Sequence, residues 1–198
     1  MRNIYASIDI GTYSCKFVVC EYYNNKLHVL ASHSVNSKGI KKGLIVEPNL
    51  VVATILEGIS EINALLGIEI KKVLVNVPDY NASFKTVKGS TTVKENNVIQ
   101  SDDISRVIKD SIYNKLEENY ELVTMVPYKY IIDSNKEFSK PIGKNCQKLE
   151  IEGIMISTPK KNIYSVLNVI EQAGLQPLLP YISLGHCFIF FAIIGHTL

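Results

Sequence analysis

The stretch DIGTYSCK at residues 9–16 lies between two runs of sequence that are typical of β-strands. Apolar and polar residues alternate over residues 3–10 before it, and the β-branched and aromatic run KFVVCEYY follows at residues 16–23. The pair Asn24-Asn25 suits a tight turn, after which residues 27–32 are predicted to return as a third strand. The chain is therefore expected to open as a β-meander with a glycine turn between its first two strands.

This turn carries residue types that bind phosphate. Gly11 lets backbone N–H groups approach an anion, Thr12 and Ser14 add hydroxyl donors, and Lys16 supplies a cation. Asp9 has the oxygen ligands that Mg²⁺ prefers beside phosphates. The stretch is neither a Walker A loop nor a Rossmann fingerprint, because it contains neither GxxxxGK[ST] nor GxGxxG. A short DxG[ST] pattern also arises by chance, so on these residues alone an ordinary polar turn remains the alternative.

The composition is that of a folded protein with no strong electrostatic preference for a partner. Of 198 residues, 46% are hydrophobic and 20% are charged, and the formal net charge is +2. This balance argues against disorder and gives no reason to expect a nucleic-acid partner. The N-terminus lacks the apolar core of a signal peptide, so a cytosolic protein is expected. The cysteines of the chain form no CxxC pair and are expected to be reduced thiols: Cys15, Cys20, Cys146 and Cys187.

A loop, a helix and a strand follow the meander. Residues 37–43 form a glycine-bracketed basic loop, and apolar residues then recur with helical spacing over residues 48–66. Gly67 is expected to end that helix. Residues 72–77 read as a strand that Pro78 terminates.

The middle of the chain is predicted to be a compact α/β unit. Two short strands, at residues 84–87 and 91–94, are expected on either side of Gly89, and Ser101 is expected to cap a helix. Three further elements follow, two strands and a helix that begins at a proline and ends at a glycine: residues 122–132, residues 147–157, and Pro159 to Gly174.

The apolar run LGHCFIFFAII at residues 184–194 allows two interpretations. It is about half as long as the roughly 20 residues that a spanning helix needs, so no membrane-spanning segment is predicted. One interpretation is a buried strand or helix. The other is an exposed apolar end that a partner covers or that causes self-association.

Four segments together resemble a known family. DIGTYSCKFVVCEYYNNKLHVL, from residue 9, resembles the first phosphate motif of the actin/hsp70-like ATPases, which is carried by a β-hairpin. SHSVNSKGIKKGLIVEPNLVVATI, from residue 32, is similar to the corresponding stretch of the bacterial cell-division protein family FtsA. MVPYKYIIDSNKEFSKPIGKNCQKLEIEGIMIS and KNIYSVLNVIEQAGLQP, from residues 125 and 161, resemble later FtsA segments. The resemblance covers residues 3–181.

The resemblance implies an α/β (α+β) fold of the actin-like ATPase, or ribonuclease H-like, class. Residues 1–83 would form the first part of subdomain 1A, including the phosphate-binding hairpin. Residues 84–175 would form the FtsA-type 1C insertion. Residues 176–198 would return to 1A as a truncated or divergent apolar tail. Subdomain 1A would be incomplete, because the family's second phosphate motif, its adenosine motif, its FtsZ-binding subdomain and its C-terminal amphipathic helix have no counterpart in this sequence. A truncated or frame-shifted gene would explain this pattern.

The same resemblance implies a function and a set of site residues. Members of the family link the FtsZ ring to the membrane and recruit other divisome proteins, at the cytoplasmic face of the cell membrane at the septum. ATP and Mg²⁺ would be the cofactors, bound weakly or not at all by this chain alone, and no hydrolysis by it is expected. Asp9 would hold the metal, and the residues implied to face the nucleotide are Asp9, Gly11, Thr12, Tyr13, Ser14 and Lys16.

Two alternatives remain open beside this hypothesis. The chain would be a non-catalytic interaction module if only the surface of its 1C-type insertion were used. It would be a relative of the actin-fold sugar or acetate kinases if the hairpin belonged to a phosphotransferase. A kinase needs a catalytic carboxylate and a substrate pocket from a later domain, and the 1C-like insertion favours FtsA.

Overall fold

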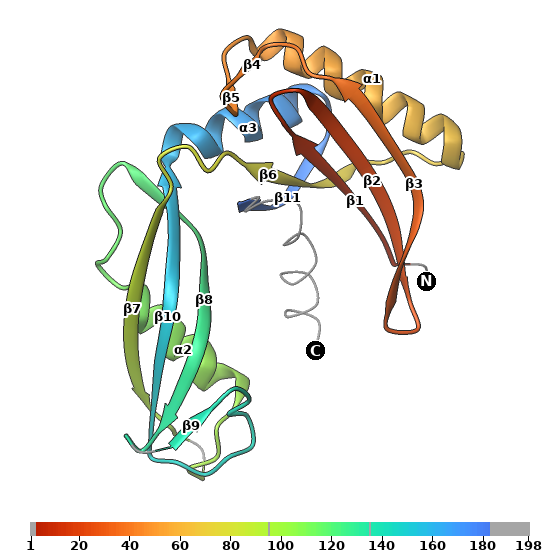
Figure 1. The fold of residues 1–198 in the computed structure, drawn as a ribbon. Coiled ribbons are helices and arrows are strands. Elements are labelled where there is room, and N and C mark those ends of the chain that lie inside the picture. Colours follow the sequence, from red (N-terminus) through yellow and green to blue (C-terminus); the bar gives the residue numbers. More distant parts are fainter. Residues whose placement is uncertain (1–2, 95, 135, 183–198) are drawn as a thin grey trace. The chain divides into compact units, whose positions relative to one another are not determined.

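A computed structural model describes residues 3–94, 96–134 and 136–182 of the chain. They divide into two compact units, the first from residues 3–81 and 160–182, the second from residues 82–159. Each unit has its own sheet and at least one helix (Figure 1).

The sheet of the first unit has five strands and mixed directions. Its first three strands form the predicted antiparallel meander, which is confirmed, and β1, β6 and β11 run parallel to one another. Asn24 and Asn25 make the tight turn of this meander in the left-handed region, at φ 50° and 57°. In their order across the sheet the strands are β11 (Gln176–Ile182), β6 (Lys72–Val77), β1 (Asn3–Ile10), β2 (Ser14–Tyr23) and β3 (Lys26–Asn36).

Two helices, α1 (Pro48–Leu66) and α3 (Lys160–Gln172), pack on this sheet. The predicted helix over residues 48–66 is confirmed, and Gly67 ends it in the left-handed conformation at φ 63°. By length and composition α1 is also long and apolar enough to cross a membrane. Its residues Val51, Ile55 and Ile62 are nevertheless fully buried in the core of the unit, as expected of a core helix.

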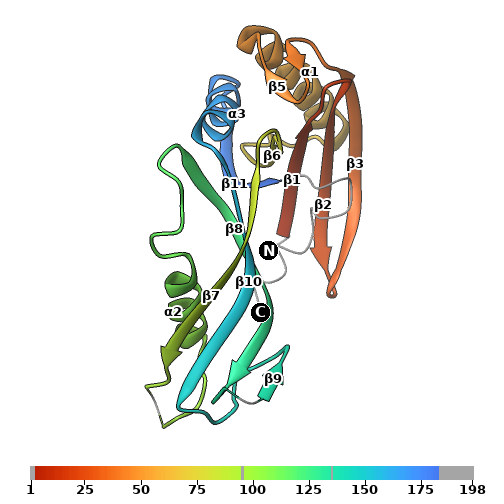
Figure 2. The ribbon, with the colours of Figure 1, turned by 60° about the vertical axis from the view of Figure 1, so that its left-hand side comes forward.

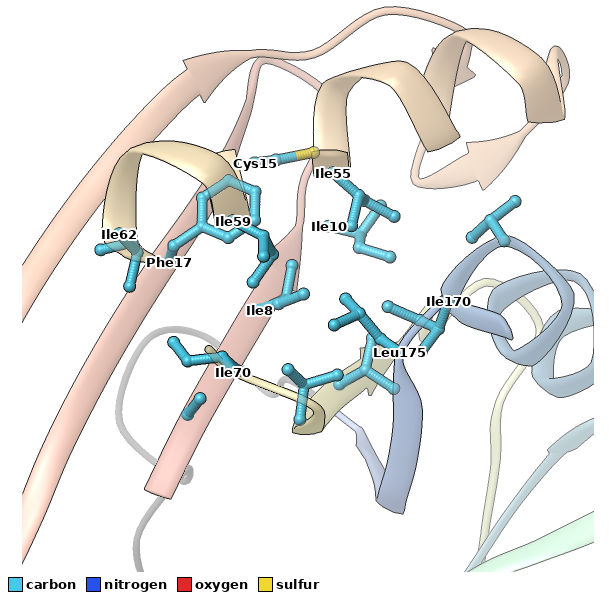
Figure 3. Packing of buried hydrophobic residues seen from close by; sticks show 14 of the residues in the cluster. Ile8, Ile10, Cys15, Phe17, Ile55, Ile59, Ile62, Ile70, Ile170 and Leu175 are labelled. Atoms are coloured by element: carbon cyan, nitrogen blue, oxygen red, sulfur yellow. The ribbon is translucent and has the colours of Figure 1, made fainter. Parts of the chain in front are cut away.

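In the core of the first unit, the side chain of Phe17 lies next to α1 (Figure 3). This ring, 1% exposed, lies against α1 beside Ile59 and Ile62. Gly58 of α1 leaves the space that the ring fills: a Cβ atom at residue 58 would lie 2.7 Å from Cδ2 of Phe17 and closer still to Cε2 and Cζ. The glycine therefore allows a close approach of helix and strand.

The second unit is a four-stranded antiparallel sheet with one helix on one of its faces (Figure 2). The residues of α2 and of the alternate strand positions that face it form a separate apolar core, which includes Val107, Leu149, Ile151 and Met155. Its elements are β7 (Ser83–Thr92), α2 (Ser101–Ile112), β8 (Tyr120–Ile132), β9 (Lys136–Phe138) and β10 (Lys148–Pro159), and the strand order is β7-β10-β8-β9.

Three predictions about this region were wrong. The two short strands expected around Gly89 are one continuous strand, because the glycine makes room for a helix rather than a turn: a Cβ there would lie 2.6 Å from the backbone nitrogen of Ser111. The cap of α2 is Gln100, whose N–H donates to the Asp103 carboxylate at 2.8 Å. Pro159 ends β10, and α3 begins one residue later.

The expected extent of the insertion also differs from the structure. The helix expected at its end is α3, which packs in the first unit, because Val166, Val169 and Ile170 belong to the core formed with α1 and the five-stranded sheet. The second unit therefore ends at residue 159 rather than 175. The apolar run at residues 184–194 lies outside the described residues.

The chain leaves the first unit and returns to it through neighbouring segments. Within the second unit, Ser83 and Ser157 are opposite each other in the antiparallel pair of β7 and β10. Within the first unit, the side-chain amide of Asn162 donates to the carbonyl oxygen of Tyr80 at 2.8 Å. In each unit, the outgoing and the returning segment of the chain are thus joined to each other.

Candidate functional site

The candidate site is the turn between β1 and β2. Strands β1 and β6 run parallel, with Ser7 opposite Leu74, so their carboxyl ends meet at the same edge of the sheet as the turn at residues 11–13. Ligands of α/β proteins bind preferentially at the carboxyl ends of parallel strands. The position of the turn therefore suits a ligand site.

Asp9 and Lys16 lie opposite each other in the β1–β2 register, on the sheet face that α1 and α3 do not cover. The Asp9 carboxylate and the Lys16 ammonium are 3.4 Å apart, with side-chain exposures of 22% and 43%. An ion pair this exposed contributes about 1 kcal/mol or less. The pair is therefore a weak contribution to the stability of the turn.

Three hydrogen bonds to backbone or hydroxyl groups hold the turn itself. The hydroxyl of Ser37 donates to the carbonyl oxygen of Gly11 at 2.6 Å, and its backbone N–H donates to the carbonyl oxygen of Tyr13 at 3.0 Å. The N–H of Gly43 donates to the hydroxyl oxygen of Thr12 at 2.9 Å. The basic loop predicted from the sequence therefore packs against the turn.

A fourth hydrogen bond reaches the turn from β6. The N–H of Ile10 donates to the side-chain oxygen of Asn76 at 2.7 Å. Both residues are buried, with exposures of 5% and 7%. The last residue of β1 is thus fixed to the neighbouring parallel strand as well as to β2.

The loop that contacts the turn is held by hydrogen bonds of its own. Its strands β4 (Ile40–Lys41) and β5 (Leu44–Ile45) pair with each other. The carbonyl oxygen of Gly39 accepts the N–H groups of Val46 and Glu47 at 2.9 and 3.1 Å. Gly39 is left-handed at φ 75° and has no space for a Cβ, which explains a glycine there.

Gly11 has a structural explanation that needs no ligand. A Cβ at this position would lie 2.8 Å from the carbonyl oxygen of Ser14, so any side chain would open the turn. The structure thus accounts for this glycine by the tightness of the turn.

The predicted site residues lie in or beside one turn: Asp9, Gly11, Thr12, Tyr13, Ser14 and Lys16. The side chain of Tyr13 is 90% exposed, and its backbone carbonyl oxygen accepts the hydrogen bond from the N–H of Ser37. Sequence reasoning missed Ser37, Gly43 and Asn76. For Ser37 and Gly43 the sequence offered one signal, the glycine-bracketed basic loop that contains them. For Asn76 it offered none, because an asparagine near the end of a strand is common.

The residues present are compatible with magnesium only together with a nucleotide. Among the described residues, no group of three or more His, Cys, Asp or Glu side chains gathers. Asp9 is thus a single carboxylate, and Mg²⁺ is commonly bound by one or two carboxylates plus substrate phosphates. The neighbouring Cys15 is not suited to bind a metal, because burial raises the pKa of its thiol.

Comparison with known protein families finds a match for the second unit. Residues 81–157 match the model of the SHS2 domain inserted in FtsA. The second unit is an FtsA-type SHS2 domain. The match ends two residues before the boundary of the second unit, in agreement with α3 belonging to the first unit.

The similarity to FtsA extends over most of the chain. It is 28% identical over 176 residues to the cell division protein FtsA of Streptococcus pneumoniae, covering 88% of this chain and 38% of that one. The identity to FtsA of Bacillus subtilis is also 28% over 176 residues, which is 88% of this chain and 40% of the relative. The predicted resemblance to FtsA is confirmed. The chain spans about two fifths of the length of these relatives.

A solved structure supports the fold. The chain of a PilM-PilN type IV pilus biogenesis complex aligns with a TM-score of 0.59 at 13% identity, over 90% of this chain and 47% of that one. At this identity the likeness concerns the fold alone. Together with the SHS2 domain it confirms the predicted fold class, an actin-like ATPase subdomain that carries an FtsA-type insertion.

Proposed function

We propose that this chain is a nucleotide-associated adaptor of bacterial cell division. Its similarity to FtsA supports a role in cell division. The finer hypothesis is that it acts at the cytoplasmic face of the membrane at the septum and contacts FtsZ and other divisome proteins. Self-association is part of the same hypothesis.

The observation that carries the nucleotide part is the convergence at the β1–β2 turn. Three segments meet there: the turn itself, the loop with Ser37 and Gly43, and the end of β6 with Asn76. Lys16 provides the cation and Asp9 the carboxylate on the sheet face away from the helices. In this proposal the turn residues bind the phosphates of ATP, Lys16 neutralises them, and Asp9 holds Mg²⁺ or its waters.

A titration of the chain with ATP and Mg²⁺ tests the proposal. Lys16→Ala should weaken binding by about 10- to 150-fold, because charged hydrogen bonds contribute about 1.5–3 kcal/mol. Lys26→Ala is the matched control, since it removes the same charge from the far end of the same sheet. Equal affinities of the parent and Lys16→Ala, or no binding by the parent at millimolar ATP, would overturn the proposal.

Hydrolysis by this chain alone is not expected. Positioning and electrostatic preorganisation supply most of the acceleration in phosphoryl transfer, and the described residues contribute one phosphate turn with one lysine. Phosphate release over hours with excess ATP and Mg²⁺ measures it. Turnover above roughly 0.1 s⁻¹ that Asp9→Ala abolishes would contradict this expectation.

The SHS2 unit favours a second candidate function, a nucleotide-independent interaction module. On the sheet face opposite α2, Phe84, Val126 and Ile154 are exposed, and Val126 lies directly opposite Ile154. Exposed apolar groups of this kind mark interaction surfaces. Binding of FtsZ that is unaffected by ATP and by Lys16→Ala, but lost in Val126→Lys, would favour this candidate over the first.

A further inference from the structure

Two residues that are not expected to touch a ligand, Ser37 and Asn76, hold the backbone of the β1–β2 turn. Ser37 holds the Gly11 and Tyr13 carbonyl groups, one with its hydroxyl and one with its own backbone N–H. Asn76 accepts the N–H of Ile10. Residues 10, 11 and 13 are thus each tied to another segment of the first unit.

The surroundings of these bonds make them strong constraints. The Ile10–Asn76 bond lies between two buried residues, where removal of the acceptor would leave a backbone N–H without solvent or partner. Ser37 is half-buried, and its hydroxyl also lies 3.4 Å from the Cys15 sulfur beneath the turn. The hydroxyl therefore has little freedom to turn away from Gly11.

The segment that carries Ser37 is itself anchored. Gly39, two residues later, binds the N–H groups of Val46 and Glu47 and lies where no other residue fits. The N–H of Gly43, beyond Gly39, donates to Thr12. Ser37 therefore belongs to a loop that is held by several hydrogen bonds, two within the loop and one to the turn.

We propose that Ser37 and Asn76 are positioning residues of the nucleotide site: they fix the conformation of the turn so that its backbone and hydroxyl groups are preorganised for a polyphosphate. This inference rests on the proposed nucleotide binding. Sites that bind anions through backbone groups depend on the placement of those groups, and a misplacement of about 1 Å can cost two orders of magnitude in rate. Neither residue supplies charge, so their effect acts through the turn.

The test uses the full chain, labelled with ¹⁵N, and titrates ATP with Mg²⁺ while the amide signals of the turn are followed. Ser37→Ala and Asn76→Leu should raise the Kd by about five- to tenfold, the factor that corresponds to one lost hydrogen bond. Ser37→Thr keeps the hydroxyl and should restore the affinity to within about twofold. Val73→Ala, in β6 on the helix side, is the control for general destabilisation.

The outcomes separate this inference from the proposed function. An unchanged Kd in Ser37→Ala and Asn76→Leu would overturn it, as would an equal rise in Val73→Ala. If the parent shows no response to ATP, the proposed function fails. Amide hydrogen exchange without ligand then still tests whether Ser37 and Asn76 fix the turn. Ser37→Ala and Asn76→Leu should speed exchange at residues 10–14 and leave exchange in α1 unchanged. Unchanged exchange at the turn would overturn the inference.

Discussion

Replacing Gly58 by alanine is expected to destabilise the first unit, although alanine is the better residue for a helix. In an exposed helix interior the substitution would contribute about 1 kcal/mol of stability. Here the new Cβ would lie 2.7 Å from Cδ2 of Phe17 and closer to two more ring atoms, against an ordinary carbon–carbon separation of about 3.5–4.0 Å. The ring is 1% exposed, so it has no open path away from the methyl group.

The size of the effect follows from these two contributions. Overpacking of a filled core costs typically about 1–3 kcal/mol, and an overlap with three ring atoms belongs near the upper end of that range. Subtracting the helix contribution leaves a net loss of about 2 kcal/mol in the free energy of unfolding of the first unit. The SHS2 unit has its own core and should not change.

Amide hydrogen exchange in α1 measures the loss, with the SHS2 amides as the internal reference. Phe17→Leu in the Gly58→Ala background should recover part of the stability, so a double-mutant cycle should give a coupling of at least about 1 kcal/mol. Ser60→Ala, on the exposed side of the same helix, is the control and should change little. A Gly58→Ala protein as stable as the parent would refute the reasoning about Phe17.

Three further outcomes are expected. Gly89→Ala should destabilise the SHS2 unit by about 3 kcal/mol or more, because the new Cβ would meet backbone atoms of α2 at 2.6 Å that cannot rotate away, and urea unfolding that leaves this unit unchanged would contradict it. The hydrogen bond from Lys88 lowers the pKa of Glu152 below 4.5, so its stabilisation should be present above pH 4.5 and disappear as the pH falls through the lower folded pKa. Glu152→Gln should flatten that part of the stability curve, and an unchanged curve would rule this out. Burial raises the pKa of Cys15, so iodoacetamide should label it in urea and not in the native protein at pH 8, whereas native labelling at the rate of a free thiol would argue against a closed core.

The elements that could be predicted from the sequence are those with a strong local pattern. The helix over residues 48–66 has apolar residues at helical spacing, a proline in its first turn and a glycine at its end, and all three features act locally. The meander was predictable for the same reason, since alternation and the Asn24-Asn25 turn are short-range signals. The turn at residues 11–13 was found in this way too.

The features that sequence reasoning missed depend on contacts between distant residues. The predicted break between two strands at Gly89 is wrong, because a glycine in a strand pattern has the same local appearance whether it interrupts the strand or admits a helix. Ser37 and Asn76 lie 26 and 66 residues from their partners in the turn. Neither contact leaves a periodic trace in the sequence, and the assignment of α3 to the first unit likewise depends on which core its apolar face meets.

The segments at which the chain leaves and re-enters the first unit are paired, so the SHS2 unit is inserted between two neighbouring points of the chain. Ser83 and Ser157 face each other across an antiparallel pair, in which opposite Cα atoms are about 4.5–5.5 Å apart. In the first unit, the side chain of Asn162, near the start of α3, donates a hydrogen bond to the carbonyl oxygen of Tyr80. A short turn between residues 81 and 160 would therefore close the gap that excision of the SHS2 unit leaves, so the first unit should tolerate the loss of that unit with its β1–β2 pairing unchanged.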